Sequence, residues 1–166
     1  MKNILLLFGL ITFLSFSLEA QKSPRLQTEG EIFGTNVKID YGAPSVKDRV
    51  IWGGLESYDV VWRAGANTNT TISFDKDVSI GGQELPAGKY GFFIIPKEEG
   101  DWAVIFNKKN AEWGAYSYDK KQDALRLNIK PEWADSNQEQ LNYSLTTNSI
   151  VMAWEKVKLS IPIKEK

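Results

Sequence analysis

Side chains that could hold a ligand concentrate in two segments of this 166-residue chain, 40–71 and 107–123. The guanidinium of Arg63 has a planar fork of N–H donors that can clamp a carboxylate, a phosphate or a pair of sugar hydroxyls. Aromatic rings combine a large flat area with a polar edge, which suits stacking on a sugar or a peptide. The residues that we expect to contact a ligand are Tyr41, Trp62, Arg63, Asn67, Trp113 and Tyr116.

Each of these residues also has a purely structural interpretation. Arg63 could form an ion pair with Asp40 or Asp59 and thereby pin its own loop to the rest of the domain. Asn67 could hold a tight turn through its own backbone, as asparagine readily does. The aromatic rings could fill the core of a small domain. The sequence leaves both interpretations open.

The composition excludes several kinds of catalysis, because the chain contains no histidine and no cysteine. Ser–His–Asp and Cys–His catalysis need these residues, as do zinc sites with nitrogen and sulfur ligands. A glycosidase would need two carboxylates across a cleft, and no spacing here singles out a pair. We therefore expect no catalytic residue, no metal and no cofactor. The carboxylates that a hydrolase could use are Glu56, Asp59, Glu84, Glu112, Asp119 and Asp123.

Alternation of apolar and polar residues, the period of a half-buried strand, predicts an all-β fold. Residues 37–41 alternate in this way, and the glycine pair 81–82 predicts a hairpin. The runs 90–95 and 102–106 are almost wholly apolar, which indicates central strands covered on both faces. The spacing of the turns predicts a jelly-roll-like antiparallel β-sandwich of roughly eight to ten short strands.

The remaining strands and the irregular segments follow from the same pattern. One short helical turn is expected within 48–61 and another within 131–135. Because connecting segments run over the surface, we expect 40–71 and 107–123 to gather at one rim of the sandwich. The other runs that predict strands are 71–74, 78–80, 84–85, 125–129, 141–145, 150–154 and 157–163.

The first 20 residues predict a secretory signal peptide. Lys2 gives a basic start, 4–18 is mostly apolar, and Ala20 is a small residue at the expected cleavage site. A membrane-spanning helix needs about 20 apolar residues, and this run is shorter. Residues 21–166 would then form one domain without a membrane span, located in the periplasm or outside the cell.

Four segments of the chain, 41–54, 61–71, 81–96 and 102–119, carry a family resemblance. Through them the chain resembles the exported bacterial family known as domain of unknown function 2911. The resemblance implies export and a single domain in Bacteroidetes-type Gram-negative bacteria, and it carries over no catalytic role. The shared elements are Tyr41 with Pro44 and Ser45, Trp62-Arg63 with Gly65-Ala66-Asn67, Leu85 to Gly88, and Trp113 to Tyr116.

These patterns favour a binding module of the cell envelope, with a small molecule, a glycan or an envelope protein as its partner. Nucleic acid is not expected, because 20 basic and 21 acidic residues balance and no basic cluster occurs. Two alternatives remain. A structural envelope protein without a ligand site would bury Trp62, Trp113 and Tyr116 completely. A carboxylate-dependent hydrolase would place two acids across a groove, one with a raised pKa.

Overall fold

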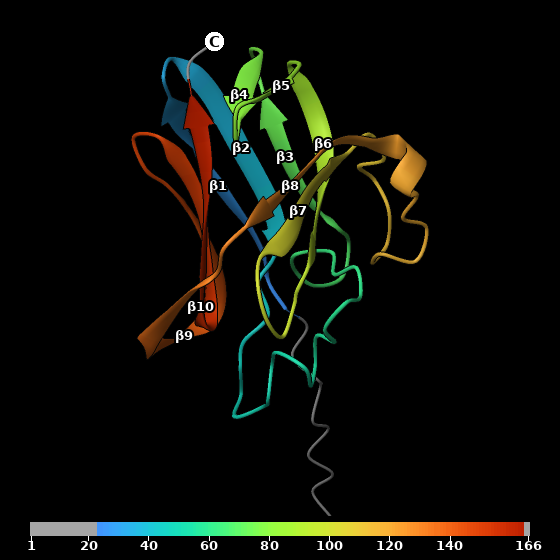
Figure 1. The fold of residues 1–166 in the computed structure, drawn as a ribbon, viewed down its shortest axis with the longest axis vertical. Coiled ribbons are helices and arrows are strands. Elements are labelled where there is room, and N and C mark those ends of the chain that lie inside the picture. The colour runs from blue at the N-terminus through green and yellow to red at the C-terminus, as the bar shows by residue number, and fades with distance from the viewer. Residues whose placement is uncertain (1–22, 165–166) are drawn as a thin grey trace, which may run out of the picture.

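The protein folds into ten β-strands and one short 3₁₀ helix, η1, as described for residues 23–164 by a computed structural model (Figure 1). No α-helix occurs among these residues, and none of their helical turns is long and apolar enough to cross a membrane. The predicted signal peptide lies outside the described residues. The elements are β1 (Arg25–Ile32), β2 (Thr35–Gly42), β3 (Thr70–Phe74), β4 (Val78–Ile80), β5 (Gln83–Leu85), β6 (Gly88–Ile95), β7 (Trp102–Asn107), η1 (Lys120–Gln122), β8 (Asp123–Ile129), β9 (Glu132–Leu145) and β10 (Ser149–Lys164).

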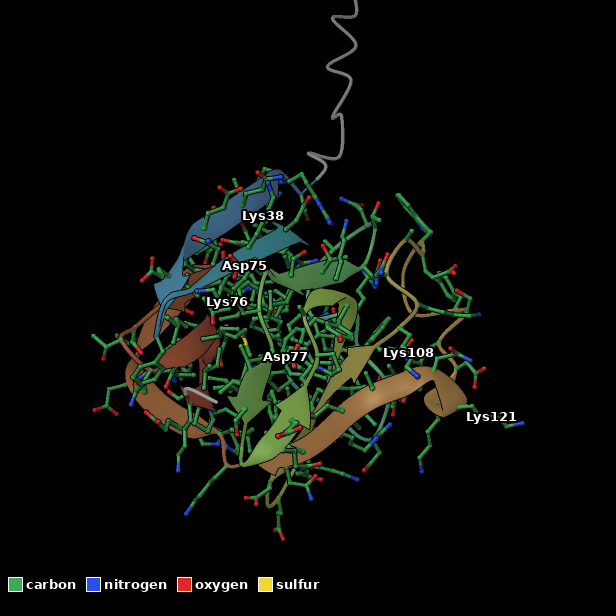
Figure 2. All side chains as sticks on the ribbon, turned by 90° about the horizontal axis from the view of Figure 1, so that it is seen from above. Lys38, Asp75, Lys76, Asp77, Lys108 and Lys121 are labelled. Atoms are coloured by element: carbon green, nitrogen blue, oxygen red, sulfur yellow. The ribbon has the colours of Figure 1, made fainter. Side chains whose placement is uncertain are left out.

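The strands form two antiparallel sheets, which confirms the predicted all-β sandwich. One sheet has six strands in the order β1-β2-β3-β6-β7-β8, and the other has four in the order β5-β4-β10-β9. Seen from above in Figure 2, side chains fill the space between the sheets, whereas Lys38 and Lys121 lie at the periphery. The alternation in β2 explains this arrangement, because Val37 and Ile39 are buried and Lys38 is exposed.

Four tryptophans form one cluster in the core. The ring centroid of Trp52 lies 4.7 Å from that of Trp102 and 5.6 Å from that of Trp154, in edge-to-face arrangements that aromatic rings favour. Trp62 stacks on Trp154 with a centroid distance of 5.5 Å. Trp102 and Trp154 belong to β7 and β10, while Trp52 and Trp62 belong to the long connection between β2 and β3. The cluster therefore anchors this connection to both sheets.

The long connection between β2 and β3, residues 43–69, lies at the end of the sandwich opposite the β4–β5 hairpin (Figure 1). The segment that follows β7 lies beside it. The backbone N–H of Asn69 donates to Glu112 O at 3.0 Å, and Gly114 N donates to Asn67 O at 3.0 Å. Thr68 and Trp113 form an isolated bridge. The two irregular segments that the sequence singled out are thus in direct contact.

The apolar runs of β6 and β7 pair with each other, as predicted, from Gly91 opposite Asn107 to Ile95 opposite Ala103. Their second face is covered by the segment after β7. The ring of Tyr118, in this segment, lies 5.3 Å from that of Phe93 and edge-on to it. This cover explains why both strands are apolar on both faces.

Three parts of the chain differ from the sequence-based expectation. The runs 150–154 and 157–163 form one continuous strand, β10, whose register with β9 shifts on both sides of Glu155. Residues 132–135, within the segment expected to form a helical turn, are the first residues of β9. The segment 48–61, also expected to hold a helical turn, forms turns without a helix, and the short helix among the described residues is η1. The first eight residues of β9 are all exposed, so no apolar alternation marked them as a strand.

Candidate functional site

A cavity of about 210 Å³ opens in the β2–β3 connection, and we call it the arginine pocket. It collects polar side chains from three turns of this connection and from the residues just before β1. Ser23, Pro44 and Gly65 contribute to its wall. The side chains that give it its chemical character are those of Arg49, Leu55, Glu56, Arg63, Ala66 and Asn67.

Arg63 is held at this pocket by the tryptophan that precedes it. Trp62 is buried, and its backbone exchanges hydrogen bonds of 2.7 and 2.9 Å with Ile94 of β6. Its indole Nε1 donates to Gly65 O at 3.2 Å, which closes the turn around Arg63. With Trp62 fixed in the core, the next side chain emerges at the pocket.

The guanidinium of Arg63 lacks the partners that a purely structural arginine would have. Asp40 pairs with Arg25, and Asp59 pairs with Lys97, so neither carboxylate is used by Arg63. Within residues 23–164, the Nε of Arg63 is buried without a hydrogen-bond partner. A buried donor in this state costs about 1–3 kcal/mol, which an acceptor in the pocket would offset.

The turn after Arg63 has a strained backbone. Ala64 has a φ value of +52°, in the left-handed region that residues with a Cβ rarely adopt, whereas Asn67 has a φ value of +64°, which asparagine tolerates. The Ala64 carbonyl accepts hydrogen bonds of 2.8 Å from both Thr70 Oγ1 and Tyr143 OH. The Asn67 amide donates to Ser23 O at 3.3 Å. Such strain persists where surrounding contacts over-determine the conformation, and it concentrates at functional sites.

Glu56 adds a titratable group to the pocket. A compact turn presents it, with Glu56 N donating to Ile51 O at 2.9 Å and Gly53 N donating to Glu56 O at 2.9 Å. Burial raises the pKa of Glu56 from 4.5 to about 7, although the charges of Arg63 and Arg49 lower it. Among the ion pairs of residues 23–164, none joins Glu56 to either arginine. Near neutral pH a large share of Glu56 is therefore uncharged, and the two arginine charges are incompletely balanced.

Arg49 is fixed by backbone carbonyls. Its Nε donates to Val46 O at 3.0 Å and its Nη2 donates to Ser45 O at 2.6 Å. These neutral acceptors orient the guanidinium without cancelling its charge. Arg49 and Arg63 thus give the pocket a positive character, and its polar groups could orient an anion.

Of the six predicted contact residues, Arg63 and Asn67 line the arginine pocket. Tyr41 and Trp62 are buried in the core and do not line the pocket, and the centroid of the Tyr41 ring lies 4.7 Å from that of Tyr143. Trp113 and Tyr116 are 58% and 91% exposed on the neighbouring segment, outside the pocket wall. A protein without a ligand site was expected to bury all three of Trp62, Trp113 and Tyr116, and only Trp62 is buried.

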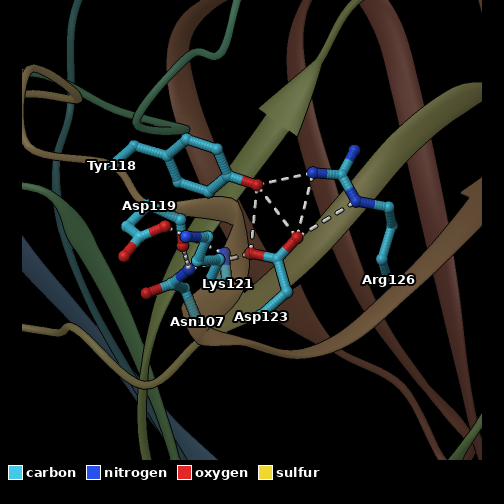
Figure 3. A network of polar contacts seen from close by, with 6 residues as sticks. All are labelled: Asn107, Tyr118, Asp119, Lys121, Asp123 and Arg126. Carbon is cyan, nitrogen blue, oxygen red and sulfur yellow. Dashed lines mark hydrogen bonds and ion pairs between the residues drawn. The ribbon is translucent and has the colours of Figure 1, made fainter.

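The segment bearing Trp113 is closed by a network of polar contacts, shown in Figure 3. The Tyr118 hydroxyl lies 2.9 Å from Asp123 Oδ2, and Arg126 Nη2 donates to both groups. Burial and the neighbouring Asp123 raise the pKa of Tyr118 to about 12. The amide of Asn107 donates to Asp123 Oδ1 at 2.8 Å, and the carboxylate of Asp119 caps η1. Asp119 and Asp123, two of the three aspartates among the candidate hydrolase acids, are therefore used structurally, and the third, Asp59, pairs with Lys97.

Sequence reasoning did not place Arg49 in the site, and it considered Glu56 only as one of six carboxylates. Both lie inside the segment 40–71 that was singled out for its irregular pattern. No spacing rule relates them to Arg63, because the turns that bring them together are set by tertiary contacts. The sequence signal that could have indicated Arg49 and Glu56 is their position within one long connection, since long connections in compact domains are often functional.

Comparison of the sequence with known proteins identifies the family of the chain. No curated protein and no solved structure matches the chain. A match to the family described as protein of unknown function (DUF2911) covers residues 23–163. It extends from before β1 to the penultimate residue of β10, so it includes both sheets and the whole arginine pocket. The chain belongs to this DUF2911 family.

Proposed function

We propose that this protein is an exported binding module that holds a small anionic ligand, bearing a carboxylate or a phosphate, in the arginine pocket. The observation that carries the proposal is the Nε of Arg63, which is buried at the pocket without a partner among the described residues. An anionic oxygen would satisfy this donor and would be attracted by Arg49 as well. Hydrogen bonds between charged groups are roughly twice as strong as neutral ones.

The size of the pocket and the raised pKa of Glu56 support a small anionic ligand. Pockets for drug-sized molecules occupy about 300–1,000 Å³, whereas this cavity measures about 210 Å³. It suits an anionic group with a short attachment. The raised pKa of Glu56 also favours an anion, because the protonated carboxyl does not repel it and can donate a hydrogen bond.

Export is part of the proposal and rests on the pattern of residues 1–20. A protein secreted with this signal would meet its ligand in the periplasm or outside the cell. The alternative of a carboxylate-dependent hydrolase gains no support from the arginine pocket, since Glu56 is the single acid among the described residues that line it. A two-carboxylate mechanism needs a second acid across the cleft.

Titration of the purified protein with sulfate, phosphate and malonate at low ionic strength tests the proposal. We expect saturable binding of at least one anion, observed by calorimetry or by backbone amide NMR shifts at residues 62–67. Arg63→Gln removes charge-assisted hydrogen bonds that contribute about 1.5–3 kcal/mol, so affinity should fall roughly tenfold to a hundredfold. Lys121→Gln is the matched control, because it removes a positive charge at the periphery, away from the pocket.

Two results would contradict the proposal. One is the lack of saturable binding for all three anions. The other is equal affinity in wild type and Arg63→Gln when both show the same circular dichroism and thermal unfolding. The second result would place any bound anion elsewhere on the surface, as expected of a structural protein without a ligand site.

A further inference from the structure

A second cavity, of about 320 Å³, shares Arg49 with the arginine pocket, and we infer that it binds a neutral saccharide. We call it the Trp133 pocket. Trp133 and Tyr58 would stack on the sugar ring, and Asp48, Glu155 and Trp52 would bond its hydroxyls. The inference is independent of the anion proposed for the arginine pocket, because apart from Arg49 the two cavities share none of the side chains that carry either argument.

The aromatic wall of the Trp133 pocket suits the C–H face of a sugar. Trp133 is 55% exposed although it is a large apolar residue, and it lies in the polar, exposed half of β9. Tyr58 is half-buried beside it, and both belong to the wall of the cavity. An indole and a phenol offer flat apolar area with polar edges, which matches a ring whose faces are apolar and whose rim carries hydroxyls.

The Trp133 pocket contains hydrogen-bond acceptors and one hydrogen-bond donor that could form further hydrogen bonds with a ligand. Asp48 forms no hydrogen bond or ion pair through its carboxylate within residues 23–164. Glu155 accepts a bond from its neighbour Lys156 N at 2.5 Å and retains further lone pairs. Trp52 is 7% exposed, and its buried Nε1 has no partner in the described part of the chain. Hydroxyls both donate and accept, so a saccharide can use all three groups.

The backbone holds both carboxylates in unusual conformations. Asp48 and Glu155 have φ values of +55° and +53°, and Glu155 lies where the register between β9 and β10 shifts. β-Bulges re-aim side chains and occur beside binding sites. Positive φ in a residue other than glycine is a sign of strain that functional sites retain. Two acidic residues from distant segments, both with positive φ, therefore meet at one cavity, and the strain falls on Glu155 because aspartate tolerates this region.

Charge argues for an uncharged ligand over an anionic one. Asp48 and Glu155 contribute two negative charges against the single positive charge of Arg49, whose guanidinium is directed to the carbonyls of Val46 and Ser45, so the net charge of the wall is negative. An anion would be repelled, and a cationic peptide would be the competing ligand. The aromatic wall combined with several hydroxyl partners favours the saccharide.

The test titrates the purified protein with glucose, N-acetylglucosamine, maltose, cellobiose and trilysine, and follows tryptophan fluorescence and amide NMR shifts. We expect one or more saccharides to bind with a Kd in about the millimolar range or below. Affinity should fall at least about tenfold in Trp133→Ala and should be largely kept in Trp133→Tyr, which retains an aromatic ring. Asp48→Asn should weaken binding less, since an amide oxygen still accepts.

Two variants serve as controls. Trp113→Ala removes a tryptophan of nearly equal exposure, 58% against 55%, outside the pocket, and should leave saccharide binding unchanged. Arg63→Gln should also leave it unchanged, which separates this test from that of the anion. The inference is overturned if no saccharide binds at about 10 mM, if Trp133→Ala binds as wild type does, or if trilysine alone binds at this pocket.

Discussion

The hydroxyl of Tyr143 on β9 donates a 2.8 Å hydrogen bond to the carbonyl oxygen of Ala64, the residue that follows Arg63. The bond crosses from the four-stranded sheet to the turn that carries Arg63, a residue of the arginine pocket. Burial, together with the nearby Tyr41, raises the pKa of Tyr143 well above its ordinary value, so the hydroxyl remains a donor. Through this bond the core holds the strained backbone of Ala64 in place.

Tyr143→Phe should lower both stability and anion affinity. The variant removes a buried donor and leaves the Ala64 carbonyl with Thr70 Oγ1 as its side-chain partner. We expect a loss of about 1–2 kcal/mol in the free energy of unfolding, measured by denaturant titration. Tyr90→Phe is the control, because it removes a bond of equal length to Pro86 O outside the pocket. Anion affinity that falls equally in both variants would contradict the link between Tyr143 and Arg63.

Gly42→Ala should disrupt the same turn through main-chain crowding. A Cβ at this position would lie 2.1 Å from Ala66 O, and the Ala66 backbone is itself bonded to Gly42 O at 3.1 Å. Because backbone cannot swing aside, we expect about 3 kcal/mol of destabilisation or failure to fold. Gly30→Ala is the matched control, since its Cβ would meet only the flexible end of Leu145 at 2.9 Å. Thermal unfolding compares the two, and equal midpoints would disprove the crowding.

Glu56 should make stability depend on pH between 4.5 and about 7. Its pKa is higher in the folded than in the unfolded chain, so the folded state binds more protons in this window. Stability is therefore lost as pH rises through it, by at most about 3 kcal/mol. Glu56→Gln should lack this component, so its advantage over wild type grows from acid to neutral pH. Denaturant unfolding at several pH values measures the difference, and parallel profiles would count against the buried carboxyl.

The same titration should affect ligand binding. Protonation of Glu56 removes a negative charge from the arginine pocket, so sulfate affinity should rise as the pH falls from above 7 to below it. Sulfate keeps its charge over this range and therefore reports on the protein alone. The pH dependence should disappear in Glu56→Gln. An unchanged dependence in that variant would assign the effect to another group.

Tyr118→Phe should open the network of Figure 3. It removes the hydroxyl that contacts Asp123 and Arg126, with an expected cost of about 1–2 kcal/mol. Because the pKa of Tyr118 is raised from 10 to about 12, the folded state binds more protons above pH 10, and wild-type stability should fall there. Tyr116→Phe, at a residue 91% exposed, is the control and should behave as wild type. Denaturant unfolding from neutral to alkaline pH provides the measurement.

The sequence by itself determined the fold class and the excluded chemistry. Alternation in 37–41, the glycine pair before β5 and the apolar runs of β6 and β7 each predict strands that the structure contains. These signals are local, because a half-buried strand must place apolar side chains on every second position. The lack of histidine and cysteine likewise excludes whole classes of catalysis from composition alone.

The alternation of apolar and polar residues did not predict the exposed part of β9. The first half of β9 shows no apolar alternation, because it pairs with β10 through its backbone while its side chains face solvent. The same backbone pairing joins two apolar runs into the single strand β10. Hydrogen bonding between main chains leaves little trace in side-chain type, so these elements could not be read from residues alone.

Only the tertiary structure decided which side chains form a site. Trp62 and Arg63 are adjacent in sequence, yet one is buried in the tryptophan cluster and the other reaches the arginine pocket. Trp133 and Asp48 are far apart in the chain and meet at one cavity. Long-range packing and hydrogen bonds fix which way each turn faces, and this direction is not encoded in the identity or spacing of neighbouring residues.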